Sequence, residues 1–128
     1  VRRAGDVIPE TERWEQLDRT EGIVQQLTGA TTKPYFRPPY GDYDDSVNAD
    51  AGAREYAYNV MWTVDSYGWK GIAAADITQR CLDLAAPGAI YTFHVGSASQ
   101  DGPALQSVID GLRAAGYSVA PLPEVLAP

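Results

Sequence analysis

The chain has 128 residues, 45% of them hydrophobic and 21% charged, and a formal net charge of -7 at pH 7. This length suits one domain with a buried core. The acidic balance argues against nucleic acid as a partner, because neutralising phosphates requires a surplus of Lys and Arg. No run approaches the roughly 18 apolar residues of a spanning helix, so we expect no membrane insertion.

Two single residues limit the possibilities further. Cys81 is the only cysteine, which excludes an internal disulfide and a cysteine-rich metal site, and core packing is its simplest role. The chain starts with Val1 rather than Met, which indicates a removed leader, a larger precursor or an edited start.

The first periodic segment predicts a helix. Residues 1–10 show no periodicity and are interpreted as an arm or linker, so that residues 11–128 form the domain. From Thr11 onward apolar residues recur at helical spacing, and Gly29 closes the helix. The apolar positions are Trp14, Leu17, Val24 and Leu27. Trp14 suits either a sugar platform or core packing, and its spacing favours packing.

The next segment begins at Tyr35 with a short apolar strand that ends in an arginine. The prolines at residues 38–39 cannot donate a ladder hydrogen bond, so the chain must leave the sheet at Arg37. Arg37 is then either a surface residue of a structural turn or a residue beside a ligand. A helix over residues 45–55 and a strand over residues 57–64 follow.

The second half continues the alternation. Residues 71–86 carry an apolar helical face, residues 89–93 form a buried strand, and residues 103–116 form a helix. A strand over residues 117–119 and a helical turn over residues 123–126 end the chain. Strands that alternate with helices imply a parallel sheet, here of four strands. Because a complete (β/α) barrel takes about 250 residues, we expect an α/β chain that is part of a barrel or a small open sheet.

Chemically useful residues follow the predicted strands. Arg37, Tyr40, Asp65 and His94 lie at or just beyond C-terminal strand ends, the edge at which parallel sheets bind ligands. His94 is the only histidine, and its imidazole can deliver a proton near neutral pH. It is interpreted either as a general acid or as a structural histidine.

Asp65 and Trp69 are expected on the same rim. A carboxylate beside an indole is typical of sugar sites, because the indole stacks on apolar sugar faces and the carboxylate accepts hydroxyl or imidazole hydrogens. The alternative is that Asp65 caps the following turn and Trp69 fills the mouth of the core.

Other kinds of site are not supported. The acidic cluster lacks the glycine and glutamate positions of a calcium loop, so its members are interpreted as turn and helix-start residues. These are Asp42, Asp44, Asp45 and Asp50. The sequence shows no phosphate-binding glycine loop and no paired histidines at ligand spacing. A nucleophilic pair of Cys81 and His94 is not expected, because burial in an apolar helix raises the thiol pKa.

Three stretches belong together: residues 37–41 (Arg-Pro-Pro-Tyr-Gly), 62–69 (Trp-Thr-Val-Asp-Ser-Tyr-Gly-Trp) and 87–94 (Pro-Gly-Ala-Ile-Tyr-Thr-Phe-His). In this order and spacing they resemble consecutive motifs of the polysaccharide deacetylases, the nodulation-type carbohydrate esterases. The resemblance implies a distorted (β/α) barrel. It also implies metal-assisted removal of N- or O-acetyl groups from chitin, peptidoglycan or xylan, with zinc or another divalent metal in the complete domain.

The resemblance also implies roles for individual residues. Arg37 would orient the base aspartate, and the backbone N–H of Tyr40 would face the oxyanion. His94 would protonate the leaving group, and Trp69 would line the acetyl or sugar pocket.

The sequence departs from the family pattern in two respects. The family's first two motifs supply the base and an aspartate with two histidines as metal ligands, whereas this chain has one histidine. We therefore expect no metal site in this chain alone and a barrel that lacks its N-terminal strands. The residue before Trp69, commonly an aspartate that supports the acid, is Gly68, so Asp65 or water must steady the imidazole of His94.

Two interpretations remain open. In the first, the chain is the C-terminal part of a secreted or cell-envelope deacetylase of acetylated polysaccharides, inactive alone and completed by a missing N-terminal segment. In the second, it is a non-catalytic carbohydrate-binding or interaction fragment. An incomplete barrel exposes a sheet edge, so self-association is also expected.

Overall fold

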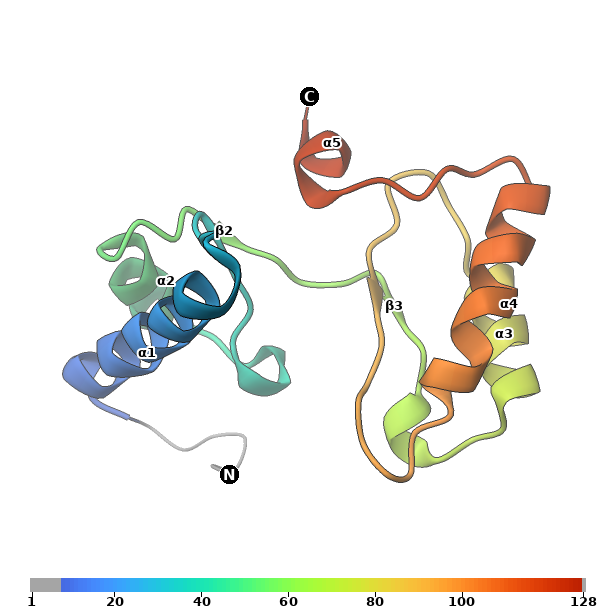
Figure 1. The fold of residues 1–128 in the computed structure, drawn as a ribbon, viewed down its shortest axis with the longest axis horizontal. Coiled ribbons are helices and arrows are strands. Elements are labelled where there is room, and N and C mark those ends of the chain that lie inside the picture. Colours follow the sequence, from blue (N-terminus) through green and yellow to red (C-terminus); the bar gives the residue numbers. More distant parts are fainter. Residues whose placement is uncertain (1–7, 128) are drawn as a thin grey trace. The chain divides into compact units, whose positions relative to one another are not determined.

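The structure is a computed structural model that describes residues 8–127. The chain divides into two compact units, Val1–Met61 and Trp62–Pro128, and each is described by itself. Figure 1 shows the helices and strands of both units, coloured from blue at the N-terminus to red at the C-terminus. The arm expected at the N-terminus falls largely on residues 1–7, outside the described residues. Helix α1 begins at Glu10, one residue earlier than the predicted start.

The first unit contains two helices and one pair of strands. Helix α1 spans Glu10–Thr28 and ends, as predicted, at Gly29, whose φ of 72° is left-handed. Strand β1 (Tyr35–Phe36) runs parallel to β2 (Tyr58–Asn59). A 3-10 turn over Pro39–Gly41 and helix α2 (Asp45–Gly52) lie between these strands in the chain.

Polar contacts fasten α1 to the rest of this unit. The carboxylate of Glu21, which is 8% exposed, accepts the Thr31 hydroxyl and both the hydroxyl and the N–H of Thr32. The side-chain hydrogen bonds from Thr31 and Thr32 lower the pKa of Glu21 to about 2. Trp14 is half-buried and donates its indole N–H to the Asp50 carbonyl at 2.9 Å. It therefore joins α1 to α2.

The second unit packs two helices beside a second pair of strands. Strand β3 (Val64–Asp65) runs parallel to β4 (Tyr91–Thr92). Helices α3 (Ala74–Asp83) and α4 (Asp101–Ala114) lie side by side (Figure 1). A 3-10 turn over Gly68–Lys70 follows β3, and the short helix α5 (Leu122–Leu126) confirms the predicted final turn.

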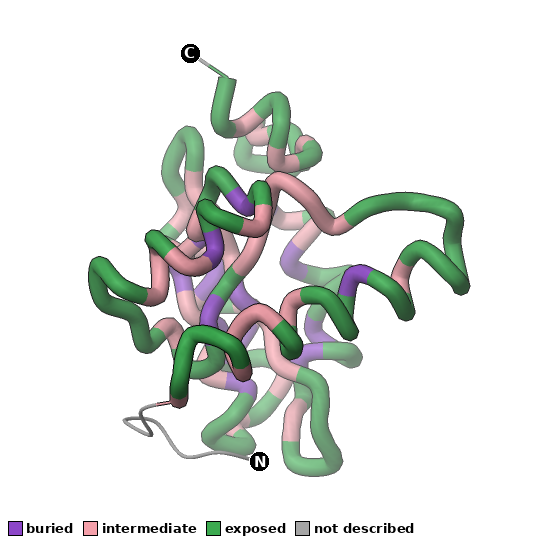
Figure 2. The backbone as a smooth tube through the Cα atoms, turned by 90° about the vertical axis from the view of Figure 1, so that its left-hand side faces the viewer, coloured by how far each residue is buried: buried purple, intermediate pink, exposed green. Residues whose placement is uncertain are grey.

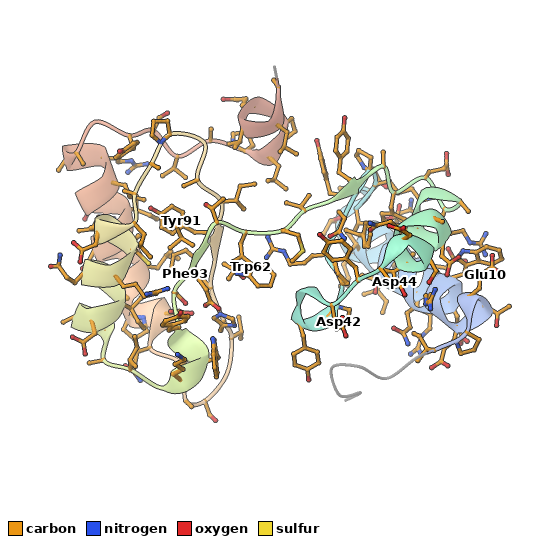
Figure 3. All side chains as sticks on the ribbon, turned by 180° about the vertical axis from the view of Figure 1, so that it is seen from behind. Glu10, Asp42, Asp44, Trp62, Tyr91 and Phe93 are labelled. Atoms are coloured by element: carbon orange, nitrogen blue, oxygen red, sulfur yellow. The ribbon has the colours of Figure 1, made fainter. Side chains whose placement is uncertain are left out.

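The core of the second unit lies between α3 and α4. Its buried members, coloured purple in Figure 2, are Ile77, Cys81, Ala104, Val108 and Leu112. Tyr91 and Phe93 of the β4 segment pack against this cluster with their rings stacked 6.2 Å apart (Figure 3). Cys81 is fully buried, which confirms its predicted packing role, and burial raises the pKa of its thiol to about 11.

The α/β class with parallel strands is confirmed, but the predicted strands differ in extent. Residues 57–64 do not form one strand, because only residues 58–59 pair with β1 and only residues 64–65 pair with β4. The described residues therefore hold two two-stranded sheets rather than one sheet of four strands. The helix predicted over residues 45–55 ends at Gly52.

The strand predicted over residues 117–119 is wrong, because the backbone N–H of Tyr117 caps α4 by donating to the Leu112 carbonyl. Gly116 ends α4 as predicted, but the helix begins at Asp101 rather than Pro103. Among residues 8–127, no helix is long and apolar enough to cross a membrane.

Candidate functional site

Three of the residues singled out from the sequence meet in the second unit. The Nε2 atom of His94 lies 2.9 Å from Oδ1 of Asp65. The indole N–H of Trp69 donates to Oδ2 of the same carboxylate at 3.3 Å, and the backbone N–H of Tyr67 donates to Oδ1 at 2.9 Å. The Asp65 carboxylate thus contacts the imidazole of His94, the indole N–H of Trp69 and the backbone N–H of Tyr67.

The strand register explains why these residues meet. Strands β3 and β4 are parallel, and Asp65 pairs with Thr92, so their carboxyl ends lie side by side. Ser66 continues the pairing by donating its N–H to the Thr92 carbonyl at 3.1 Å. His94 follows Thr92 by two positions and therefore emerges at the same edge as Asp65.

Hydrogen bonding keeps Asp65 ionised. Burial alone raises the pKa of this carboxyl, but the Tyr67 N–H and His94 hydrogen bonds outweigh burial, and the pKa lies below its usual value. The side chains of His94 and Asp65 are 30% and 20% exposed. The pair is therefore open to a ligand and partly sheltered from solvent.

An aromatic rim borders the pair. The side chain of Trp69 is 58% exposed, and its ring meets Tyr67 edge to face at 6.3 Å. The Lys70 ammonium lies 3.8 Å from the Tyr67 ring centre and 5.1 Å from that of Trp69. The Arg80 guanidinium also lies over Tyr67, at 3.6 Å, and its Nε donates to the Asp65 carbonyl. Trp69 thus offers indole surface to solvent instead of filling the core.

Sequence reasoning did not identify two buried polar residues at this site. Asp101, the first residue of α4, is 3% exposed, and Ser66 is fully buried. Oδ2 of Asp101 accepts the backbone N–H of His94 at 2.6 Å and the Ser66 hydroxyl at 2.9 Å. The sequence signal that could have led to Asp101 is Gly68, because a position without the expected carboxylate suggests that another acid lies near His94.

Arg37 and Tyr40 belong to the first unit. The Nε of Arg37 donates to the Val60 carbonyl at 2.6 Å, and its Nη2 donates to the Met61 carbonyl at 3.3 Å. Arg37 therefore ties the end of β1 to the chain that follows β2. Tyr40 has a φ of 60° in the 3-10 turn, and its side chain is 62% exposed. The roles predicted for these two residues stay predictions.

Asp44 and Asp50 of the first unit have structural roles. Asp44 caps α2 by accepting the Val47 N–H at 2.9 Å, and Asp50 forms an ion pair with Arg13. Within residues 8–127, no three His, Cys, Asp or Glu side chains are grouped so that they could hold a metal ion. The described residues therefore do not fit the divalent metal that the resemblance implies.

A family model and two relatives similar to this chain are all described as deacetylases. A family model described as "Polysaccharide deacetylase" matches residues 5–60. The chain is 33% identical over 105 residues to a peptidoglycan-N-acetylglucosamine deacetylase of Bacillus cereus, covering 82% of this chain and 36% of the relative. It is 33% identical over 103 residues to a bifunctional xylanase/xylan deacetylase of Cellvibrio japonicus, covering 80% of this chain and 15% of that protein.

A solved structure is also similar. The crystal structure of a CE4 family pseudoenzyme from Bacillus anthracis matches with a TM-score of 0.85 and 29% identity, covering 98% of this chain and 43% of that one. The chain thus spans less than half of each of these proteins.

Proposed function

The chain belongs to the polysaccharide deacetylase family, and from this premise we propose that its second unit supplies the proton-donor side of a deacetylation site. The observation that supports this most directly is the contact of 2.9 Å between His94 Nε2 and Asp65 Oδ1. An ionised carboxylate at this distance stabilises the imidazolium form of the ring, which is the form that donates a proton.

The proposed step is protonation of the leaving group. Loss of an acetyl group breaks the bond from the acyl carbon to the sugar nitrogen or oxygen, and that atom must gain a proton as it leaves. With Nε2–H donated to Asp65, the ring nitrogen that delivers this proton is Nδ1 of His94. Asp65 holds the ring in place and faces the positive charge before transfer.

Other residues have proposed roles in binding. The exposed indole of Trp69 would stack on the sugar beside the His94 and Asp65 pair. We also propose that the Tyr40 N–H faces the oxyanion and that Arg37 orients a base aspartate, as in the family. The two parallel strand pairs would form part of the family's distorted barrel.

The proposed substrate is an acetylated cell-wall polysaccharide. The relatives named above act, by their names, on peptidoglycan or xylan, which supports action at the cell envelope or outside the cell. Zinc or another divalent metal would be held by residues other than the described ones, since these do not fit it. The chain alone is therefore proposed to release no acetate, and its activity would require residues from a further segment.

A second candidate function is non-catalytic glycan binding. The observation that favours it is the similarity to a protein described as a pseudoenzyme, together with the exposed Trp69. An aromatic rim is sufficient to bind a sugar without chemistry.

One experiment separates the two functions. Acetate release from N-acetylated chitooligosaccharides and acetylated xylan is measured for the chain alone and for the chain mixed with the segment that precedes the matched region in the Bacillus cereus relative. Catalysis predicts acetate and bound divalent metal in the mixture only. Glycan binding by the chain alone, weakened about tenfold in Trp69→Ala, with no acetate in the mixture, identifies a binding module.

Self-association is part of the same proposal. Each sheet of the described residues has two strands, and a strand from another copy could extend such a short sheet. Light scattering across a range of concentrations should show a mass that rises above 13.8 kDa. A constant monomer mass at high concentration would contradict this.

A further inference from the structure

Asp101 is a buried acid to which the proposed chemistry assigns no role. A carboxylate removed from water is costly unless hydrogen bonds compensate for the lost hydration. Oδ2 of Asp101 accepts two hydrogen bonds, from the His94 N–H and the Ser66 hydroxyl. Oδ1 is buried and has no hydrogen-bond partner among the described residues. Both hydrogen bonds to Oδ2 therefore come from the strand ends rather than from the N-terminus of α4.

The position of this carboxylate explains the glycine at residue 68. A Cβ atom built on Gly68 would lie 2.2 Å from Oδ2 and 2.5 Å from Oδ1 of Asp101. Gly68 is not among the glycines with a left-handed φ, so its backbone is compatible with a side chain. Glycine is therefore needed here for space, because the Asp101 carboxylate fills the place where a side chain at residue 68 would begin.

We propose that Asp101 is a positioning residue for His94, supplying from α4 the carboxylate that position 68 cannot carry. The resemblance implies an aspartate at position 68 that supports the acid histidine. In this chain the same volume is filled by an aspartate 33 positions further along the chain, counted from the two residue numbers.

The contacts show how Asp101 acts on the site. Its bond to the His94 N–H fixes the backbone from which the imidazole extends toward Asp65. Ser66 links the same carboxylate to the turn after β3, because its hydroxyl donates to Asp101 and accepts the Gly68 N–H at 3.1 Å. One buried group thus couples the two strand ends that carry Asp65 and His94.

The charge of Asp101 also acts on the imidazole. The charged groups gathered here are Asp65 from β3, Asp101 from α4 and the Arg80 guanidinium from α3. Lys70 lies further out, over the rings of the rim. Removing the charge of Asp101 while keeping its shape should make the imidazolium less stable. The role in catalysis rests on the proposed function, but the effect on His94 does not.

The test uses the single histidine of the chain. NMR follows the His94 ring signals as a function of pH in the wild type, Asp101→Asn, and the control Asp76→Asn, which changes an exposed aspartate in the first turn of α3. We expect Asp101→Asn to lower the pH midpoint of these signals by about one unit, since an opposite charge within several ångströms has an effect of this size. The control should leave the midpoint unchanged.

A second variant, in which the carboxylate is exchanged between residues 68 and 101, keeps the test decisive if Asp101→Asn does not fold. Gly68→Asp combined with Asp101→Ala puts a carboxylate back into the space beside residue 68, now carried by the turn after β3, and should restore the wild-type midpoint. A folded Asp101→Asn with the wild-type midpoint would overturn the proposal. If Asp101→Asn does not fold, the exchange variant decides in the same way, because its failure to fold or a lowered midpoint would count against the proposal. Acetate release is not part of this readout, so failure of the proposed function leaves a distinct result.

Discussion

The space around Gly68 yields a prediction whose size can be worked from the structure. In Gly68→Ala the new Cβ would stand 2.2 Å from Oδ2 and 2.4 Å from Cγ of Asp101. Unstrained contacts need about 3.5 Å, so the carboxylate must move by about 1 Å. Overpacking of this kind costs about 1–3 kcal/mol, and weakening a charge-assisted hydrogen bond costs about as much. We expect a loss of about 3 kcal/mol in the free energy of unfolding.

The assay is a double-mutant cycle by urea unfolding, followed by circular dichroism. In an Asp101→Ala background the obstacle is gone, so the same Gly68→Ala change should cost nothing or stabilise by up to about 1 kcal/mol. Gly22→Ala is the matched control, because a Cβ at this exposed position in α1 meets no atom within 4 Å. Equal costs of Gly68→Ala in both backgrounds would refute the steric argument.

Three further predictions follow from other residues. Glu21→Gln should destabilise the first unit at neutral pH. Because the pKa of Glu21 is lowered from 4.5 to about 2 in the folded chain, the ionised carboxylate stabilises the fold fully above about pH 4.5, and this stabilisation is lost as the pH falls toward 2. Urea midpoints measured at several pH values will show this loss. In a completed enzyme, His94→Ala should lower turnover by about a hundredfold or more, and an unchanged rate of acetate release would remove His94 from the mechanism. The buried Cys81 thiol, with a pKa of about 11, should react with a thiol reagent at pH 8 only after unfolding, and rapid labelling of the native chain would contradict its burial.

The sequence was most informative where a local signal decides the structure. Helix ends at Gly29 and Gly116 could be predicted because glycine readily adopts the left-handed conformation that closes a helix. The apolar face predicted over residues 71–86 likewise corresponds to α3, which places Ile77 and Cys81 in the core. These features depend on residues a few positions apart.

Strand pairing was less predictable because it depends on partners elsewhere in the chain. Residues 57–64 have the composition of a single strand. In the structure, however, residues 58–59 pair with β1, residue 64 pairs with β4, and residues 60–63 are not assigned to a strand. Residues 117–119 have no strand partner in the described structure, and the Tyr117 N–H instead donates to the Leu112 carbonyl of α4. Hydrophobic pattern alone does not contain this information.

The candidate site shows the same division. Asp65 and His94 could be placed together from sequence, because each follows a strand and parallel strands end at a common edge. The contact between Asp65 and Trp69 could also be expected, since the two are four residues apart. The contact of Arg80 with Tyr67 was not anticipated, because it depends on how α3 packs against the turn after β3.

Gly68 shows how a departure from a family pattern can be tested by structure. A glycine at this position is consistent with a special backbone conformation, with a lost function or with a lack of space. Its φ argues against the first, and the contacts of a Cβ with Asp101 support the third. A buried carboxylate still faces the His94 backbone, but it is now attached to α4. Any change that shifts the start of α4 should therefore also shift His94 relative to Asp65, which an aspartate at position 68 would not require.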